Sequence, residues 1–132
     1  MATPFVMAFD PGMTKIGVAV GQRITGSASP VTNLRAQDGI PDWTQVEKLV
    51  REWQPIRFVV GLPLNMDGSE SEMSVRAKKF SRRLEGRFGI PATTMDERLT
   101  TREADEHATK GERVDAIAAC IILESWFRNV PE

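Results

Sequence analysis

The chain has 132 residues, and its 17 lysines and arginines against 18 aspartates and glutamates give a net charge of −1. This length predicts one domain over residues 1–132, because domains cluster near roughly 100–150 residues. A near-neutral charge excludes binding through bulk positive charge, so a nucleic-acid partner would have to be held by a local patch. A single cysteine and a single histidine exclude an internal disulfide and a Cys/His zinc site.

The apolar runs are only a few residues long, which predicts that no segment spans a membrane. The N-terminus also lacks the basic start, apolar run and cleavage site of an export signal. We therefore expect a cytoplasmic protein without a membrane partner.

Strand patterns are predicted at residues 5–10, 16–21, 27–34, 57–62 and 92–95, and a tight turn at 11–15 joins the first two. Helical spacing of apolar residues is found at 43–53, after a plausible N-cap at Asp42, and at 73–88. A short helical segment is expected from residue 101 and a final helix at 114–127. The order β-β-β-α-β-α-β-α predicts an α/β fold, a five-stranded mixed sheet flanked by helices.

Carboxylates stand at the ends of several predicted elements. Asp10 ends the first strand, Asp96 and Glu97 follow the fifth, and Asp115 lies in the first turn of the last helix. In a helix-linked sheet, strand ends that share an edge meet where ligands bind. Clustered carboxylates repel one another unless a cation neutralises them, and oxygen ligands suit Mg²⁺ or Mn²⁺. Each acid alone is more simply explained as a turn or helix-end residue, but their coincidence favours a metal site.

Four segments, beginning at Asp10-Pro-Gly, Gly61-Leu-Pro-Leu-Asn, Asp96-Glu-Arg-Leu-Thr-Thr and Val114-Asp-Ala-Ile, together resemble the YqgF/RuvX family. These are RNase H-like proteins described as Holliday junction resolvases and as nucleases that process the small-subunit ribosomal RNA precursor. The resemblance covers most of the chain and implies an RNase H-like fold. It also implies a metal-dependent nuclease that uses Mg²⁺ or Mn²⁺.

The resemblance further implies that Asp10, Glu97 and Asp115 are the catalytic, metal-binding acids. Asp96 remains an alternative to Glu97, because adjacent residues of a strand point to opposite faces and the register is open. Two features depart from the family pattern. Met13 stands where a threonine is usual, and only 13 residues separate Thr101 from Asp115, where the family has a longer basic segment.

Several polar residues are candidates for binding substrate. The positive charges at 76, 79, 83 and 87 follow helical spacing, and this basic stripe (Arg76, Lys79, Arg83, Arg87) could neutralise phosphates, although a solvated helix face is an equal alternative. The remaining candidates lie in predicted turns and at helix ends, near the acids: Lys15, Asn65, Arg98, Thr100, Lys110 and Arg113. Asp67 could add a metal ligand, but an Asx-type turn at Asp67-Gly68 is the stronger interpretation.

The remaining notable side chains are interpreted as structural. His107 lies in a polar stretch and is expected at the surface, whereas Cys120 lies among small apolar residues and is expected in the core. The three tryptophans, Trp43, Trp53 and Trp126, are expected on apolar helix faces.

The leading hypothesis is thus a nuclease that hydrolyses phosphodiester bonds, acting at the 5′ end of the 16S ribosomal RNA precursor. The alternatives are a Holliday junction resolvase and a non-catalytic nucleic-acid-binding module with the same fold. An actin-like phosphotransferase is discounted, because it needs two copies of such a fold. The expected oligomeric state is a monomer or a weak homodimer.

Overall fold

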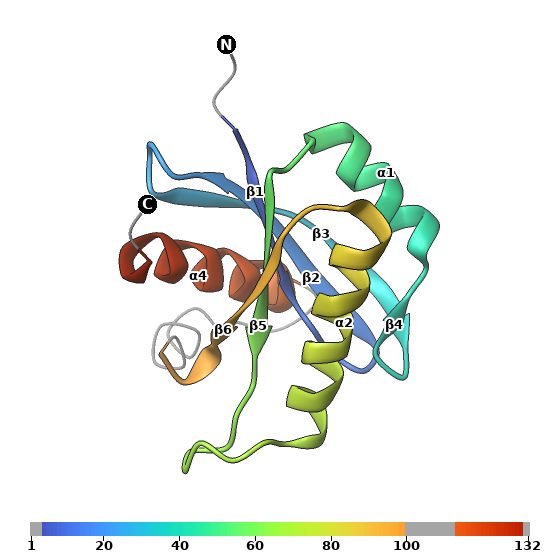
Figure 1. Ribbon diagram of the computed structural model, residues 1–132, viewed down its shortest axis with the longest axis vertical. Helices are drawn as coiled ribbons and strands as arrows, with labels where there is room; N and C mark the ends of the chain where they lie inside the picture. The colour runs from blue at the N-terminus through green and yellow to red at the C-terminus, as the bar shows by residue number, and fades with distance from the viewer. Residues whose placement is uncertain (1–3, 100–112, 131–132) are drawn as a thin grey trace.

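A computed structural model describes residues 4–99 and 113–130 of the chain, with the side chains of 4–98 and 116–130. Its strands form one sheet in the order β4-β3-β2-β1-β5-β6 (Figure 1). The strands are β1 (Val6–Asp10), β2 (Lys15–Gln22), β3 (Ser27–Gln37), β4 (Ile40–Pro41), β5 (Arg57–Leu62) and β6 (Ala92–Asp96).

The sheet is mixed, as predicted. β1, β2, β3 and β4 pair antiparallel in succession, whereas β1 pairs parallel with β5 and β5 pairs parallel with β6. The prediction of five strands is wrong by one, because β3 extends to Gln37 and turns back through Gly39 into the two-residue β4. Two residues are too few to produce a strand pattern in the sequence.

The helices of the described residues are α1 (Trp43–Trp53), α2 (Glu72–Phe88), the 3₁₀ turn η1 (Glu97–Leu99) and α4 (Arg113–Asn129). Asp42 caps α1 as predicted, since its carboxylate accepts a 3.0 Å hydrogen bond from the Thr44 amide. Gly89 ends α2 in the left-handed conformation, at a φ of 67°. None of these helices combines the length and hydropathy needed to cross a membrane.

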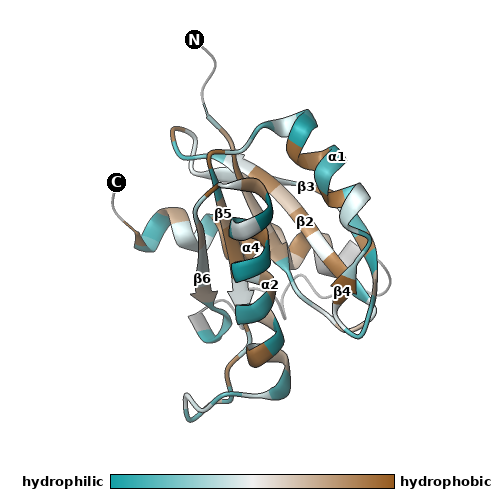
Figure 2. Cartoon of the chain, turned by 45° about the vertical axis from the view of Figure 1, so that its right-hand side comes forward, coloured by the Kyte–Doolittle hydropathy of each residue, from teal (hydrophilic) through white to brown (hydrophobic). Residues whose placement is uncertain are grey.

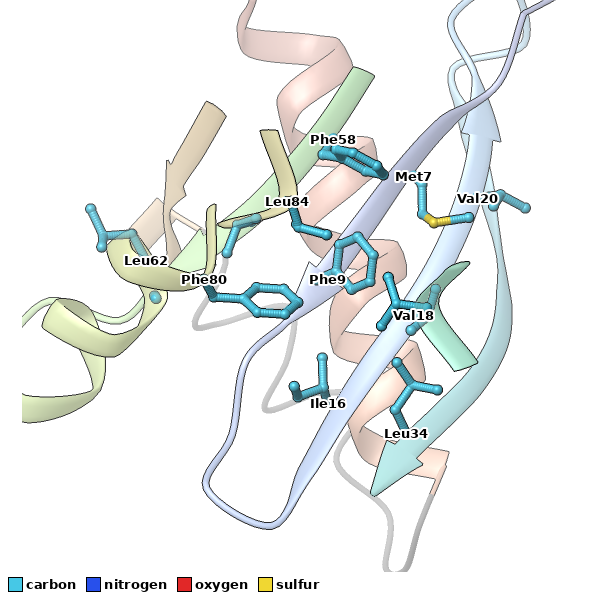
Figure 3. Packing of buried hydrophobic residues seen from close by; sticks show 13 residues of the cluster. Met7, Phe9, Ile16, Val18, Val20, Leu34, Phe58, Leu62, Phe80 and Leu84 are labelled. Atoms are coloured by element: carbon cyan, nitrogen blue, oxygen red, sulfur yellow. The ribbon is translucent and has the colours of Figure 1, made fainter. Parts of the chain in front are cut away.

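The sheet buries both faces, and alternation along β1 divides its side chains between them. Met7 and Phe9 face α1 and α2, where Phe9 packs edge-on against Phe80 of α2 (Figure 3). Val6 and Ala8 face α4 instead. Figure 2 shows hydrophilic residues along the outward sides of α1 and α2 and hydrophobic residues on the strands of the sheet.

The predictions that the cysteine and the tryptophans belong to the core are largely confirmed. Cys120 is buried on the α4 face beside Ala19 and Ala119, and Trp126 is buried in the neighbouring cluster. Trp43 and Trp53 are only partly buried and pack at the margin of the α1–α2 core. The predicted surface position of His107 and the short helix from residue 101 lie outside the described residues.

Candidate metal and nucleic-acid site

The carboxyl ends of the three parallel strands bring Asp10 and Glu97 together. Asp10 is the last residue of β1 and Glu97 directly follows β6, with β5 paired between them. The two carboxyl groups lie close enough to interact, and the interaction with Asp10 acts to lower the pKa of Glu97. Residues 87 positions apart in the sequence therefore meet at the predicted edge of the sheet.

The Glu97 side chain lies over the backbone of Gly61, the fifth residue of β5. A Cβ atom on Gly61 would lie 3.0 Å from Glu97 Cδ and 2.6 Å from Ile122 Cδ1, closer than carbon atoms ordinarily approach. Ile122 belongs to α4 and is only 1% exposed. Glycine thus leaves the space in which the Glu97 carboxyl is enclosed between β5 and α4.

This enclosure controls the protonation of Glu97. Burial raises the pKa of the Glu97 carboxyl, because desolvation disfavours its charged form, and the negative charge of Asp96 raises it further. The hydrogen bond with Asp10 acts in the opposite direction and lowers the pKa, but the effect of burial is larger. A carboxyl with a raised pKa beside a second carboxyl is the arrangement that a bound cation would relieve.

The adjacent Asp96 points to a different partner. Its carboxylate receives three contacts from the Arg98 guanidinium, of which the shortest joins Nη2 to Oδ2 at 2.7 Å, and it also accepts the Arg98 amide at 2.9 Å. These hydrogen bonds hold the pKa of Asp96 below its usual range. Of the two alternatives left open by the sequence, Glu97 is therefore the one that faces Asp10.

Arg98 also fastens the loop that follows β5. Its Nη1 donates a 3.3 Å hydrogen bond to the Met66 carbonyl and lies beside Gly68. Within this loop Asp67 accepts hydrogen bonds from the amide and hydroxyl of Ser69, so the predicted Asx-type turn is confirmed. Asn65, a substrate-binding candidate, is exposed and donates to the Ser69 hydroxyl at 3.0 Å.

The turn between β1 and β2 is the third segment at this edge. Gly12 is required there, because a side chain would collide with the Lys15 carbonyl. Lys15 opens β2 and is half-buried, so this candidate lies on the same edge as Asp10. Met13 is at the surface of the turn, and its carbonyl accepts a 3.0 Å hydrogen bond from the Gly39 amide.

The basic stripe lies on α2, but its two ends are engaged within the protein. The Arg76 guanidinium donates to the Asp38 carbonyl, and that of Arg87 stacks 4.3 Å above the Trp43 ring. Lys79 and Arg83 line a small pocket between these two contacts. The central pair is therefore the part of the stripe that is available to a phosphate.

For four of the predicted site residues, the structure describes either no atoms or the backbone alone. Thr100 and Lys110 lie outside the described residues, and Arg113 and Asp115 occupy the first turn of α4 with side chains that are not described. No group of three metal-binding side chains occurs among the described residues. The role of Asp115 as a third ligand stays a prediction.

Two residues that shape the site, Gly61 and Ile122, were not predicted from the sequence. The position of Gly61 near the end of a buried strand was visible, but nothing in the sequence indicates which side chain it accommodates. Ile122 is one of several apolar residues of α4. Only the packing of α4 on β5 shows that Ile122 encloses the Glu97 carboxyl.

The sheet of this chain begins with an antiparallel hairpin and ends with parallel strands, and it carries carboxylates at the ends of β1 and β6. These features define the RNase H-like class of nuclease folds. Solved structures agree. The chain is similar to Thermus thermophilus RuvC in complex with Holliday junction substrate, with a TM-score of 0.61 and 15% identity over 94% of this chain and 93% of that one. It is also similar to the yeast mitochondrial Holliday junction resolvase Ydc2, with a TM-score of 0.53 and 10% identity over 96% and 78%.

Within that class the chain belongs to the RuvX family, described as Holliday junction resolvase, whose model matches residues 4–129. A relative from Actinobacillus pleuropneumoniae serotype 5b is 55% identical over 92% of this chain and 95% of its own length. Another, from Haemophilus ducreyi, is 52% identical over 99% and 100%. Both relatives carry the name "Putative pre-16S rRNA nuclease". The resemblance noted in the sequence is thereby confirmed.

Proposed function

We propose that the chain acts as a single nuclease domain over residues 1–132 and hydrolyses phosphodiester bonds of the 16S ribosomal RNA precursor, at its 5′ end, in the cytoplasm. The contact between Asp10 and Glu97 at the ends of β1 and β6 carries the proposal. The names of relatives more than 50% identical favour the RNA substrate.

The residues present fit a divalent metal ion. Asp10 and Glu97 offer hard oxygen donors, and their two carboxyl groups lie together at one edge of the sheet. Asp115, in the first turn of α4, is the proposed third ligand. A bound Mg²⁺ or Mn²⁺ would supply a water molecule activated for attack and would neutralise charge on the reacting phosphate.

The surrounding side chains have separate tasks in this proposal. Burial between Gly61 and Ile122 orients the Glu97 carboxyl and limits its access to water. Arg98 neutralises Asp96, so that this second carboxylate does not compete with Glu97. Lys15 and Asn65, at the same edge of the sheet, would contact substrate beside the reacting bond, as would Thr100, Lys110 and Arg113 where the chain continues toward α4.

Lys79 and Arg83 would bind phosphates farther along the substrate, because α2 leads away from the edge that carries the acids. A branched DNA junction is the second candidate substrate. It is favoured by the description of the RuvX family, and a symmetric junction would require two copies of the chain.

An Asp10→Asn variant tests the metal site. Cleavage of a precursor RNA and of a four-way DNA junction is measured with Mn²⁺, and the variant should lose at least about 100-fold in rate, as expected when a group that acts in the transition state is removed. Without metal, its thermal stability should be unchanged or higher, because a self-repelling charge is removed. Asp67→Asn is the matched control, since that carboxylate serves an exposed turn.

The outcomes are distinct. Cleavage by wild type of the RNA alone supports the proposed substrate, and cleavage of the junction alone supports the resolvase activity. Full activity of Asp10→Asn, or a markedly lower melting temperature, would make Asp10 a structural residue. Binding of nucleic acid by wild type without any metal-dependent cleavage would identify a non-catalytic module.

A further inference from the structure

A groove of about 780 Å³ lies at the end of the sheet opposite to the acids. Its floor is formed by Val6 at the start of β1 and by the neighbouring residues of β5 and β6, and its walls by the β2–β3 hairpin and the last turn of α4. The groove is therefore separate from the site that contains Asp10.

The walls of the groove carry unusually exposed apolar side chains. Ile24, in the hairpin, is 79% exposed, and Ile56, just before β5, is 57% exposed. Isolated apolar residues are common on protein surfaces, but here two of them border one concave surface with Met95 and Val130. This combination indicates a surface that another molecule covers.

Two arginines give the same groove a positive charge. The Arg23 guanidinium lies 4.7 Å from the centre of the Trp126 ring and donates a 2.8 Å hydrogen bond to the Val130 carbonyl. The Arg57 guanidinium lies 5.9 Å from the same ring. None of the described residues that line the groove is acidic, and neither arginine forms an ion pair within the described part of the chain. The ring holds both charges in place without neutralising them.

The groove also reaches the edge of the sheet. Thr93 and Thr94 both line it, although successive side chains of a strand point to opposite faces, so the backbone of β6 also borders the groove. Among the strands that the structure describes, β6 is the last in the sheet order and pairs with β5 alone. The edge strand of a sheet can accept an additional extended segment.

From these features we propose that the groove binds an extended, acidic segment of a partner protein, in which apolar side chains alternate with carboxylates. The apolar side chains would enter the groove between Ile24 and Ile56, and the carboxylates would pair with Arg23 and Arg57. A nucleic acid fits less well, because the walls are apolar and Trp126, at 6% exposure, offers no free face for stacking a base.

The probe is a labelled synthetic peptide that alternates glutamate with leucine, measured by fluorescence anisotropy. Because side chains of an extended peptide alternate in direction, its leucines all lie on one side. We expect a dissociation constant of roughly micromolar size, as in small transient interfaces. A peptide with glutamine in place of glutamate should bind about tenfold more weakly, because the charge pairing is lost. The difference should shrink with added salt.

Three variants locate the binding. Arg57→Gln and the double variant Ile24→Ser/Ile56→Ser should each weaken the glutamate peptide about tenfold, since one removes the charge and the other the apolar walls. The control is Met66→Ser/Val75→Ser, which replaces two apolar residues that are 83% and 53% exposed outside the groove. It should bind like wild type. Thermal melting verifies that all variants are folded.

Three results would overturn the proposal. The first is equal binding of the glutamate and glutamine peptides, or equal binding by wild type and Arg57→Gln. The second is binding of a labelled uridine oligonucleotide that Arg57→Gln abolishes while the peptide does not bind, which would make the groove a nucleic-acid site. The third is a dimer of wild type that Ile24→Ser/Ile56→Ser converts to a monomer, which would assign the groove to a second copy of the chain.

Discussion

Replacing Gly61 by alanine tests how the site holds Glu97. The new Cβ atom would lie 2.6 Å from Ile122 Cδ1 and 3.0 Å from Glu97 Cδ, so at least one of these side chains must move. Ile122 is buried against the sheet and has little space to yield. Overpacking of this kind costs about 1–3 kcal/mol of unfolding free energy, and we expect a loss in that range.

The same substitution should also slow cleavage in protein that is fully folded. Relief of a 3.0 Å contact displaces the Glu97 carboxyl by several tenths of an ångström, and a misplacement near 1 Å in a catalytic group costs on the order of 100-fold in rate. We expect a fall of about 10- to 100-fold in Mn²⁺-dependent cleavage. Urea denaturation measures the stability, and single-turnover cleavage under conditions where the protein is folded measures the rate.

Two further variants separate the effects. Gly86→Ala is the matched control, because nothing lies within 4 Å of the added atom on the exposed side of α2, and alanine should add about 0.5–1 kcal/mol of stability with unchanged cleavage. Gly61→Ala combined with Ile122→Val removes the Cδ1 contact but keeps the contact with Glu97. This double variant should regain stability without regaining activity. Full activity in Gly61→Ala alone would refute the role assigned to the enclosure.

Two more predictions concern α2 and α4. Lys79→Glu/Arg83→Glu should weaken nucleic-acid binding about tenfold or more at low salt and reduce the salt dependence of binding. Binding titrations at several salt concentrations measure both effects. An unchanged affinity would show that the basic stripe does not bind nucleic acid. Burial raises the pKa of the Cys120 thiol to about 12, so at pH 8 only about 1 in 10⁴ is thiolate, and iodoacetamide should modify Cys120 in the unfolded protein but not in the folded one. Rapid alkylation of the folded protein would contradict that burial.

Local patterns were sufficient to predict most of the fold. The residues at 57–62 form β5 with the predicted bounds, because a largely apolar run flanked by Pro55 and Pro63 leaves little freedom. Helical spacing predicted α2 to within one residue, since its apolar positions recur on one face. β4 was missed because a two-residue strand forms only through its pairing with β3, which local sequence does not indicate.

The candidate site was predictable only as a set of residues. Asp10 and Glu97 are recognisable from their positions after strands, but which of Asp96 and Glu97 turns inward depends on where β6 ends and η1 begins. The roles of the basic stripe residues could not be told apart from the sequence either. Four charges at helical spacing look equivalent in the sequence, yet Arg87 lies over Trp43 and Arg76 binds the Asp38 carbonyl. Contacts between distant segments decide such roles.

The boundary between β6 and η1 has a consequence for variation at this position. Asp96 and Glu97 are neighbours in the chain, yet one carboxyl turns outward to Arg98 and the other inward to Asp10. Inserting or deleting a single residue ahead of them would exchange these directions and place the wrong acid inside. Among related chains, this stretch should therefore accept replaced side chains far more readily than altered length.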